Sequence, residues 1–203
     1  PDRGEVFLSG KPVRIHSPKD ALRHGIGMVH QHFMLVDVFS AIENMGLIGD
    51  GKTFSITNRR KIEDTLEQLK QKYGIDVDLH SPVGQLSIGM QQKVEILKLL
   101  YTGADVLIFD EPTAVLLPQE CDGLFEIIAN LTSEGKGVIF ISHKLDEVLK
   151  ISRRITVLTK GRVTGQIDTK DADKSTIVRM MVGEEVTPPE FSKIRRDRKD
   201  MVP

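Results

Sequence analysis

The alternation of apolar and polar positions at the start of the chain predicts a hairpin followed by a short helix and a strand. Residues 5–8 and 13–15 are short β-like runs on either side of a turn-type Ser-Gly-Lys-Pro tetrapeptide. Ser17 is a candidate N-cap, and Pro18 stands at the first helical position after it. Residues 27–30 then form a brief apolar run, which predicts a strand.

The middle of the chain has helical periodicity. We expect helical structure between residues 39 and 73, and a second helix from Ser87 to about Tyr101. In the first of these segments, apolar residues recur at three- and four-residue steps and form one face: Ile62, Leu66, Leu69 and Tyr73.

After residue 105 the pattern changes to alternating strands and helices. Residues 106–109 are a continuous apolar run, typical of a strand buried on both faces, and residues 137–141 predict a second buried strand. A third strand is predicted at 155–158, and helices at 124–131 and 145–151 separate the three strands. This order predicts an α/β fold in which crossover helices connect the strands of a parallel sheet.

Composition excludes several classes of protein. Hydrophobic residues make up 39% of the 203 residues and charged residues 28%, as in an ordinary globular domain. The formal net charge of -1 does not favour binding to nucleic acid, and the single cysteine, Cys121, cannot form an internal disulfide. No apolar run approaches the roughly 18 to 20 residues that cross a bilayer. We therefore expect any work at a membrane to depend on a partner.

The strongest chemical motif is VLIFDEPT at residues 106–113. Its two carboxylates, Asp110 and Glu111, follow a buried parallel strand, at the sheet edge where ligands bind in open α/β folds. Asp110 is placed to hold Mg²⁺, and Glu111 to act as general base for an attacking water. The alternative is a pair of acids that only end a strand before a turn.

A second motif, LSIGMQQKVEI, spans residues 86–96. Ser87 and Gly89 stand at the start of a helix, where unpaired backbone N–H groups and the helix dipole favour an anion. Taken alone, Ser87 is better interpreted as an ordinary N-cap.

Two further candidates follow predicted strands. His143 follows the strand at 137–141 by two residues, at the same edge as the acids, and could donate a hydrogen bond to a terminal phosphate. Gln31 follows the strand at 27–30 and could sense a metal and the attacking water. His30 and His32 flank it, but no carboxylate or cysteine lies nearby at ligand spacing, so no transition-metal site is expected there.

The order and spacing of these motifs resemble the ABC ATPases over residues 4–186. The resemblance implies that Gln31 is the Q-loop glutamine, that residues 86–91 are the signature, and that Asp110 and Glu111 are the Walker B pair. His143 would be the switch histidine. It further implies a P-loop NTPase-like parallel sheet with an inserted α-helical signature subdomain, about residues 35–103, that binds ATP and Mg²⁺. In this assignment Glu111, His143 and Gln31 are catalytic, Ser87, Gly89 and Gln91 bind nucleotide, and Asp110 and Gln31 serve the metal.

The sequence segments VHQHFMLV, TAVLLPQE and ISHKLDEVL look most like those of the importers of nucleosides and simple sugars. The resemblance implies an ATP-hydrolysing subunit at the cytoplasmic face of the cell membrane. Its expected partners are transmembrane permease subunits, a second ATPase domain (as a homodimer or in tandem) and, indirectly, a solute-binding protein, without nucleic acid. The transported solute and the presence of a second ATPase domain are not predicted. Residues 187–203 are expected to form a charged linker or tail.

The chain departs from the family pattern in two places. Ile88 and Met90 replace one glycine and the glutamine of the usual signature L-S-G-G-Q, and residues 114–118 offer no aspartate after Walker B.

A match to the phosphate-loop pattern G-x-x-x-x-G-K-[ST] is expected to be a coincidence. It consists of Gly46, Gly51, Lys52 and Thr53, follows a predicted helix, and comes after Gln31 instead of before it. The family's phosphate loop would then lie upstream of Pro1, the sheet would be incomplete, and this chain alone would hydrolyse negligible ATP. Two alternatives stay open: a soluble ABC ATPase that acts on DNA or ribosomes, and a fragment without enzymatic activity.

Overall fold

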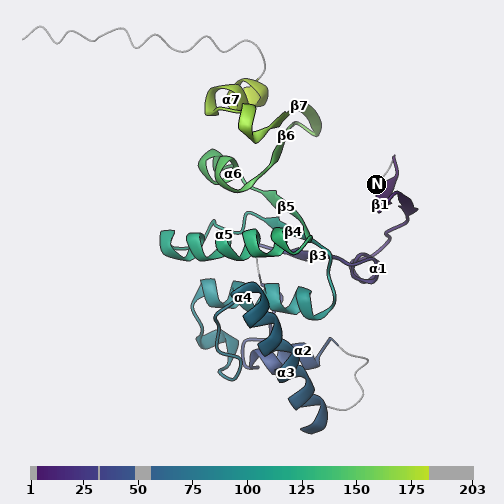
Figure 1. The fold of residues 1–203 in the computed structure, drawn as a ribbon, viewed down its shortest axis with the longest axis vertical. Coiled ribbons are helices and arrows are strands. Elements are labelled where there is room, and N and C mark those ends of the chain that lie inside the picture. The colour runs from purple at the N-terminus through teal and green to yellow at the C-terminus, as the bar shows by residue number, and fades with distance from the viewer. Residues whose placement is uncertain (1–3, 32, 49–55, 183–203) are drawn as a thin grey trace, which may run out of the picture. The chain divides into compact units, whose positions relative to one another are not determined.

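The computed structural model describes residues 4–31, 33–48 and 56–182 (Figure 1). Its internal contacts divide the chain into two compact units, Pro1–Ile151 and Ser152–Pro203, which are described in turn. The first unit contains the predicted site residues.

The first unit begins with the predicted hairpin and short helix. Strand β1 (Val6–Leu8) pairs antiparallel with β2 (Lys11–Val13), so the hairpin is confirmed with slightly shifted bounds. Helix α1 (Pro18–Arg23) starts at the predicted proline, and the Ser17 side chain accepts a hydrogen bond from the backbone N–H of Asp20. Capping of an otherwise unpaired donor fixes the start of this helix.

Three parallel strands carry the candidate site, in the order β3-β4-β5: β3 (Ile26–Val29), β4 (Val106–Asp110) and β5 (Gly137–Ile141). The register aligns Val29 with Phe109, and Phe109 with Phe140. The carboxyl ends of the strands therefore share one edge. Helix α5 (Pro118–Ser133), which extends beyond the predicted 124–131, connects β4 to β5, and α6 (Leu145–Ile151) follows β5 as predicted.

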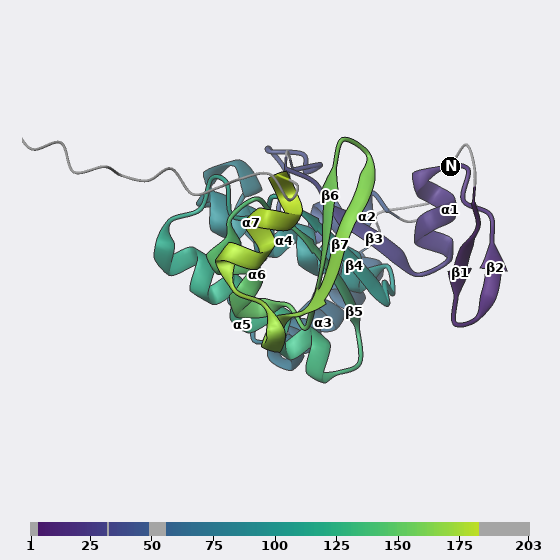
Figure 2. The same ribbon diagram turned by 90° about the horizontal axis from the view of Figure 1, so that it is seen from above.

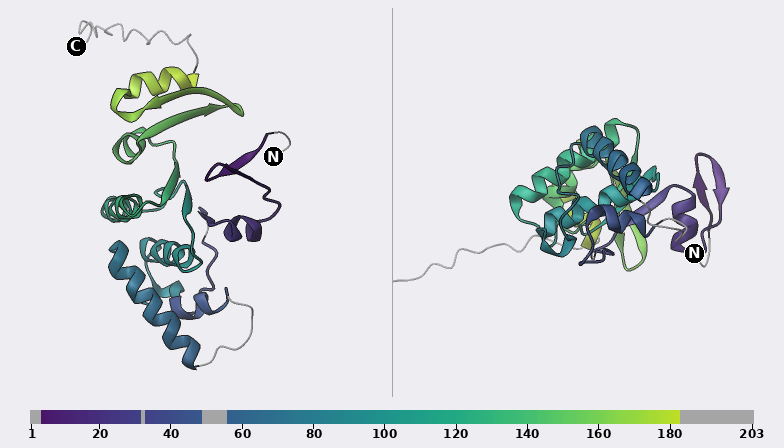
Figure 3. Two further views of the ribbon diagram at one scale, coloured as in Figure 1. Left: turned by 45° about the vertical axis from the view of Figure 1, so that its right-hand side comes forward. Right: turned by 90° about the horizontal axis from the view of Figure 1, so that it is seen from below.

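Helices cover one face of this sheet. Val29, Leu107 and Phe109 are fully buried in a core shared with apolar side chains of the helices that pack along β3 and β5 (Figure 3). On the opposite face of β5, Ile139 is 51% exposed. The prediction that β5 is buried on both faces was therefore wrong, because within the described residues the covering helices lie against one face only.

The segment between β3 and β4 is helical: α2 (Ala41–Gly46), α3 (Ile56–Tyr73), the 3-10 turn η1 (Val83–Gln85) and α4 (Ile88–Tyr101). These three α-helices pack against one another through buried residues such as Ile42, Leu66 and Leu97. Within this region one helix ends at Gly46 and the next begins at Ile56. The phosphate-loop match therefore follows a helix, as expected, and its remaining residues at 49–53 lie outside the described part.

The second unit is a long hairpin with a helix beside it (Figure 2). Strand β6 (Arg154–Thr159) pairs antiparallel with β7 (Arg162–Asp168), and the turn η2 (Thr169–Asp171) leads to α7 (Lys174–Val182). The prediction that residues 155–158 add a parallel strand was wrong. Lys160 and Gly161 both have positive φ, 50° and 75°, which forms a two-residue turn between antiparallel strands. The predicted tail at 187–203 lies outside the described residues.

Candidate active site

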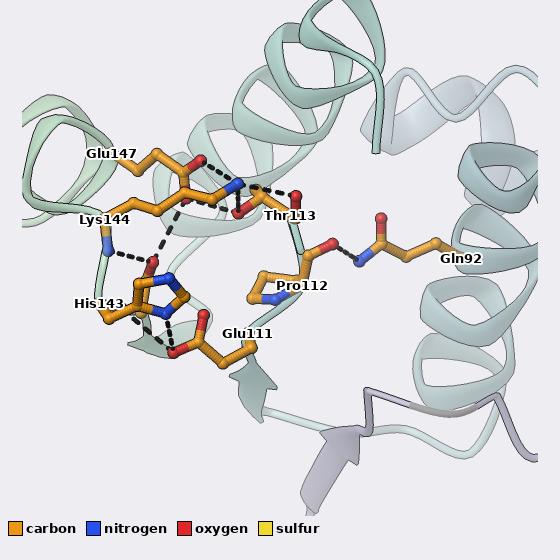
Figure 4. Close-up of polar contacts among 8 residues, drawn as sticks. Gln92, Glu111, Pro112, Thr113, His143, Lys144 and Glu147 are labelled. Atoms are coloured by element: carbon orange, nitrogen blue, oxygen red, sulfur yellow. Dashed lines mark hydrogen bonds and ion pairs between the residues drawn. The ribbon is translucent and has the colours of Figure 1, made fainter. Parts of the chain in front are cut away.

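Glu111 and His143 meet at the carboxyl edge of the parallel sheet. The Nδ1 atom of His143 lies 2.8 Å from Oε1 of Glu111, and the backbone N–H of His143 donates to the same oxygen at 3.1 Å (Figure 4). Glu111 follows β4, and His143 lies two residues beyond the end of β5. The parallel register brings both ends together, as the sequence predicted.

The backbone of Glu111 adopts an unusual conformation. Its φ is +46°, a left-handed value that residues other than glycine rarely adopt. Its backbone N–H donates to the carbonyl of Ile141 at 2.9 Å. Such conformations cost of order 1–3 kcal/mol and concentrate at functional sites. This conformation begins the loop that leaves the strand and brings Glu111 to the neighbouring strand end.

The second carboxylate oxygen of Glu111, Oε2, is buried and has no hydrogen-bond partner among the described residues. Unpaired buried acceptors are rare in folded proteins and call for a missing partner such as a water, an ion or a ligand. Oε1 already holds two N–H donors. Oε2 is therefore the oxygen that remains to accept a proton.

The hydrogen bond to Glu111 constrains the imidazole of His143. An ionised carboxylate only accepts hydrogen bonds, so Nδ1 carries the hydrogen in that state. If Nε2 is also to donate to an anion, the ring must be protonated. The pair can thus present a carboxylate oxygen and an imidazole nitrogen to a common ligand.

The structure places Asp110 and Gln31 at the same edge without joining them to this pair. Asp110 ends β4 and is half-buried, and no hydrogen bond or ion pair engages its carboxylate in the described ranges. Gln31 is exposed, two residues after β3. Among the residues that the structure describes, no group of three or more His, Cys, Asp or Glu side chains is suited to a metal. Mg²⁺ usually takes one or two carboxylates plus water and phosphate oxygens, so the free carboxylate of Asp110 fits it.

The predicted signature residues lie at the start of α4. Ser87 caps the helix, accepting from the N–H of Met90 at 3.3 Å, and its hydroxyl donates to Oε1 of Glu120 at 3.0 Å. A Cβ on Gly89 would come within 2.6 Å of that oxygen. Hence Ser87 is an N-cap, and a carboxylate oxygen already lies at the positive end of the helix, a position that suits an anion.

The remaining signature residue, Gln91, is held by its own segment. Its side-chain amide donates to the carbonyl of Leu86 at 3.1 Å. In the described residues no hydrogen bond joins Ser87, Gly89 or Gln91 to Glu111 or His143, so the predicted site residues form two clusters.

Sequence reasoning missed the residues that hold the loop after Glu111. The buried Gln92 amide donates to the carbonyl of Pro112 at 2.9 Å, and the Thr113 hydroxyl donates to Glu147 at 2.6 Å. Figure 4 shows Gln92 on one side of this loop, and Lys144 and Glu147 on the other. Two sequence features could have pointed to these residues. Thr113 ends the DEPT motif, and Lys144 and Glu147 have the i,i+3 spacing typical of paired charges on a helix.

The segment after Gln31 is tied to α4. Buried Glu95 accepts from the backbone N–H of Met34 at 2.5 Å, and Lys98 donates to the Met34 carbonyl at 3.0 Å. The Met34 side chain itself is exposed, as is Val38 at 75%.

The described helices include none long and apolar enough to span a membrane.

Comparison with known proteins gives the family. The family described as "ABC transporter" matches residues 1–114. The nucleoside import ATP-binding protein NupA of Lactococcus lactis is 44% identical over 92% of this chain, and the guanosine import ATP-binding protein NupO of Bacillus subtilis is 45% identical over 92%. The chain spans 37% of the length of each.

A solved structure has the same fold. The chain resembles cbiO1 of Clostridium perfringens, part of the ABC transporter complex cbiONQ, with a TM-score of 0.71 and 25% identity over 88% of this chain and 71% of that one. The family match, the motif order and the meeting of Glu111 with His143 agree, and the chain belongs to the ABC transporter family.

Proposed function

We propose that this chain is part of the ATP-binding and hydrolysing subunit of an ABC importer for nucleosides or simple sugars. The observation that carries the proposal is the buried, unpartnered Oε2 of Glu111, held beside His143 at the edge of the parallel sheet. The solute class is supported by relatives named for nucleoside, guanosine and ribose import, at 40–45% identity.

In the proposed reaction Glu111 is the general base. Oε2 takes the proton of a water that attacks the terminal phosphate of ATP, while Oε1 keeps its two N–H donors and holds the side chain in place. His143 presents Nε2 toward the phosphate and stabilises its charge. Asp110 and Gln31 would hold Mg²⁺, which neutralises phosphate charge when bound. Proton transfer and charge stabilisation thus occur on one edge of the sheet.

The start of α4 would contact a second nucleotide. Ser87, Gly89 and Gln91 would face the ATP held by another ATPase domain, in a homodimer or a tandem arrangement, so that two domains close on the nucleotide. The Glu120 carboxylate, which lies 3.0 Å from the Ser87 hydroxyl, must then move or share its donor when the phosphate arrives. ATP binding would shift the pair of domains toward closure and hydrolysis would reopen it.

The helical segment, about residues 35–103, would contact the transmembrane permease. Exposed apolar side chains gather in the stretch that follows Gln31: Met34, Val36, Val38 and Phe39. Because Glu95 and Lys98 clamp the Met34 backbone to α4, movement of Gln31 would be passed to this surface. The chain would act from the cytoplasmic face of the membrane, with a solute-binding protein as an indirect partner.

The proposal is tested with Glu111→Gln in the protein as encoded, which keeps the shape of the side chain and removes the base. The variant should retain radiolabelled ATP as triphosphate through gel filtration, with hydrolysis lowered by about 100-fold or more. Glu126→Gln, an exposed position on α5, is the matched control. Wild-type rates of hydrolysis in Glu111→Gln would remove Glu111 from this role, and a wild type that neither binds nor hydrolyses ATP would refute the function.

A further inference from the structure

A second hydrogen-bond network joins the two loops that carry Glu111 and His143. Glu147, in the first turn of α6, accepts from the hydroxyl of Thr113 at 2.6 Å and of Ser142 at 3.4 Å. Lys144 forms an ion pair with Glu147 at 3.2 Å and donates to the Thr113 carbonyl at 2.9 Å (Figure 4). The network therefore connects the loop after β4 with the loop after β5.

The network is better shielded from water than the contact that it supports. Thr113 is fully buried, and the side chains of Glu147 and Lys144 are 14% and 39% exposed, whereas the imidazole of His143 is 71% exposed. Hydrogen bonds to a charged group gain strength where water is excluded, and exposed ion pairs contribute little. The Glu111–His143 contact alone is thus a weak tie between the loops.

The network is also close to the reacting groups along the chain. Thr113 is two residues from Glu111, and Ser142 is the residue before His143. The left-handed backbone of Glu111, with φ of +46°, persists only where the surroundings fix it. Besides the backbone bond from Glu111 to Ile141, side chains hold this loop from both sides: Gln92 on one, and Lys144 and Glu147 on the other.

We infer that Thr113 and Glu147 are positioning residues, which hold Glu111 and His143 at the spacing needed for ATP hydrolysis. The inference rests on the proposed function for the reaction, but its structural content does not. Loss of the Thr113 hydroxyl should let the loop after β4 relax away from β5. The Oε1–Nδ1 distance of 2.8 Å would then lengthen although neither residue has changed.

The test uses Thr113→Val, which keeps the shape of the side chain and removes the hydroxyl, and Glu147→Gln, both in the protein as encoded. We expect kcat for ATP hydrolysis to fall by about 10- to 100-fold with KM changed by less than about twofold, because small misplacements of reacting groups cost rate and not binding. Thr113→Ser, which restores the hydroxyl, should recover most of kcat.

Asp122→Asn is the matched control, since it breaks the exposed 2.7 Å ion pair between Asp122 and Lys150, which joins α5 to α6 outside this network. It should leave kcat within about twofold of wild type. A normal kcat in Thr113→Val and Glu147→Gln, or an equal loss in Asp122→Asn, would overturn the inference. If the wild type itself fails to hydrolyse ATP, the proposed function fails. A crystal structure of Thr113→Val then decides the inference, because an unchanged Glu111–His143 contact overturns it and a lengthened one supports it.

Discussion

The side-chain amide of Gln92 on α4 donates a 2.9 Å hydrogen bond to the backbone carbonyl of Pro112, the residue after Glu111. Both residues are buried, and only 2% of Gln92 is exposed. The helix that begins with the predicted signature residues is therefore joined directly to the loop that begins with the proposed general base. This bond joins the two clusters of site residues.

Replacing Gln92 with leucine should destabilise the chain. The buried carbonyl of Pro112 would lose its partner, and a buried unsatisfied polar group costs about 1–3 kcal/mol. The free energy of unfolding, measured by urea denaturation, checks this. Gln85→Leu, at an exposed position without a side-chain hydrogen bond in the described part, should change it by less than about 0.5 kcal/mol. Equal effects of the two substitutions would show that the Gln92 bond does not contribute.

The stability of the helical segment should depend on pH through Glu43. A hydrogen bond from the backbone N–H of Ser40 is the main cause that lowers the pKa of Glu43 below its ordinary value of 4.5. A group with a lowered folded-state pKa stabilises the fold above its unfolded pKa and loses this contribution as pH falls through the folded value. The advantage of wild type over Glu43→Gln should thus be complete above pH 4.5 and shrink below it.

Unfolding free energies of the two proteins between about pH 3 and pH 7 measure this difference. Glu126→Gln, which removes a carboxylate without such a hydrogen bond among the described residues, should show no comparable shrinkage. An advantage of wild type over Glu43→Gln that stays constant below pH 4.5 would contradict the prediction.

Val38→Glu should weaken association with the proposed permease. Val38 is 75% exposed and lies in the apolar stretch after Gln31, so a charge there costs little in the isolated chain but must be desolvated in an apolar interface. We expect recovery of permease in co-purification to drop by about tenfold, equivalent to about 1.4 kcal/mol. Val163 is also exposed but lies on β7, so Val163→Glu should not affect recovery. Normal recovery with Val38→Glu would place the permease elsewhere.

The sequence predicted those features that depend on local chemistry. Ser17 and Ser87 were expected as N-caps because their hydroxyls precede helical periodicity, and both cap helices. The meeting of Glu111 and His143 was predictable because parallel strands end at one edge. In contrast, β7 was missed because the Lys160–Gly161 turn does not have the usual turn residues, Asn-Gly or Asp-Gly.

Apart from the meeting of Glu111 and His143 at two strand ends, features that depend on long-range contacts could not be predicted. The ties from Gln92 to Pro112 and from Glu147 to Thr113 join residues 20 and 34 positions apart, and either glutamine or glutamate could equally be a solvated surface residue. The positive φ of Glu111 is set by the packing of two loops and not by its own preference. Exposure of Ile139 depends on which face of the sheet the helices cover, which the apolar run alone does not specify.

A double-mutant cycle on Glu111 and His143 tests most directly whether the two residues act on one reacting phosphate. ATP hydrolysis would be measured for wild type, Glu111→Gln, His143→Ala and the double variant, at saturating Mg²⁺ and ATP. Each single substitution should lower kcat by about 100-fold or more, and the double variant should retain at least about tenfold more activity than the product of the two losses predicts. Losses that multiply would contradict the account, because they would mean that Glu111 and His143 contribute independently despite their 2.8 Å contact.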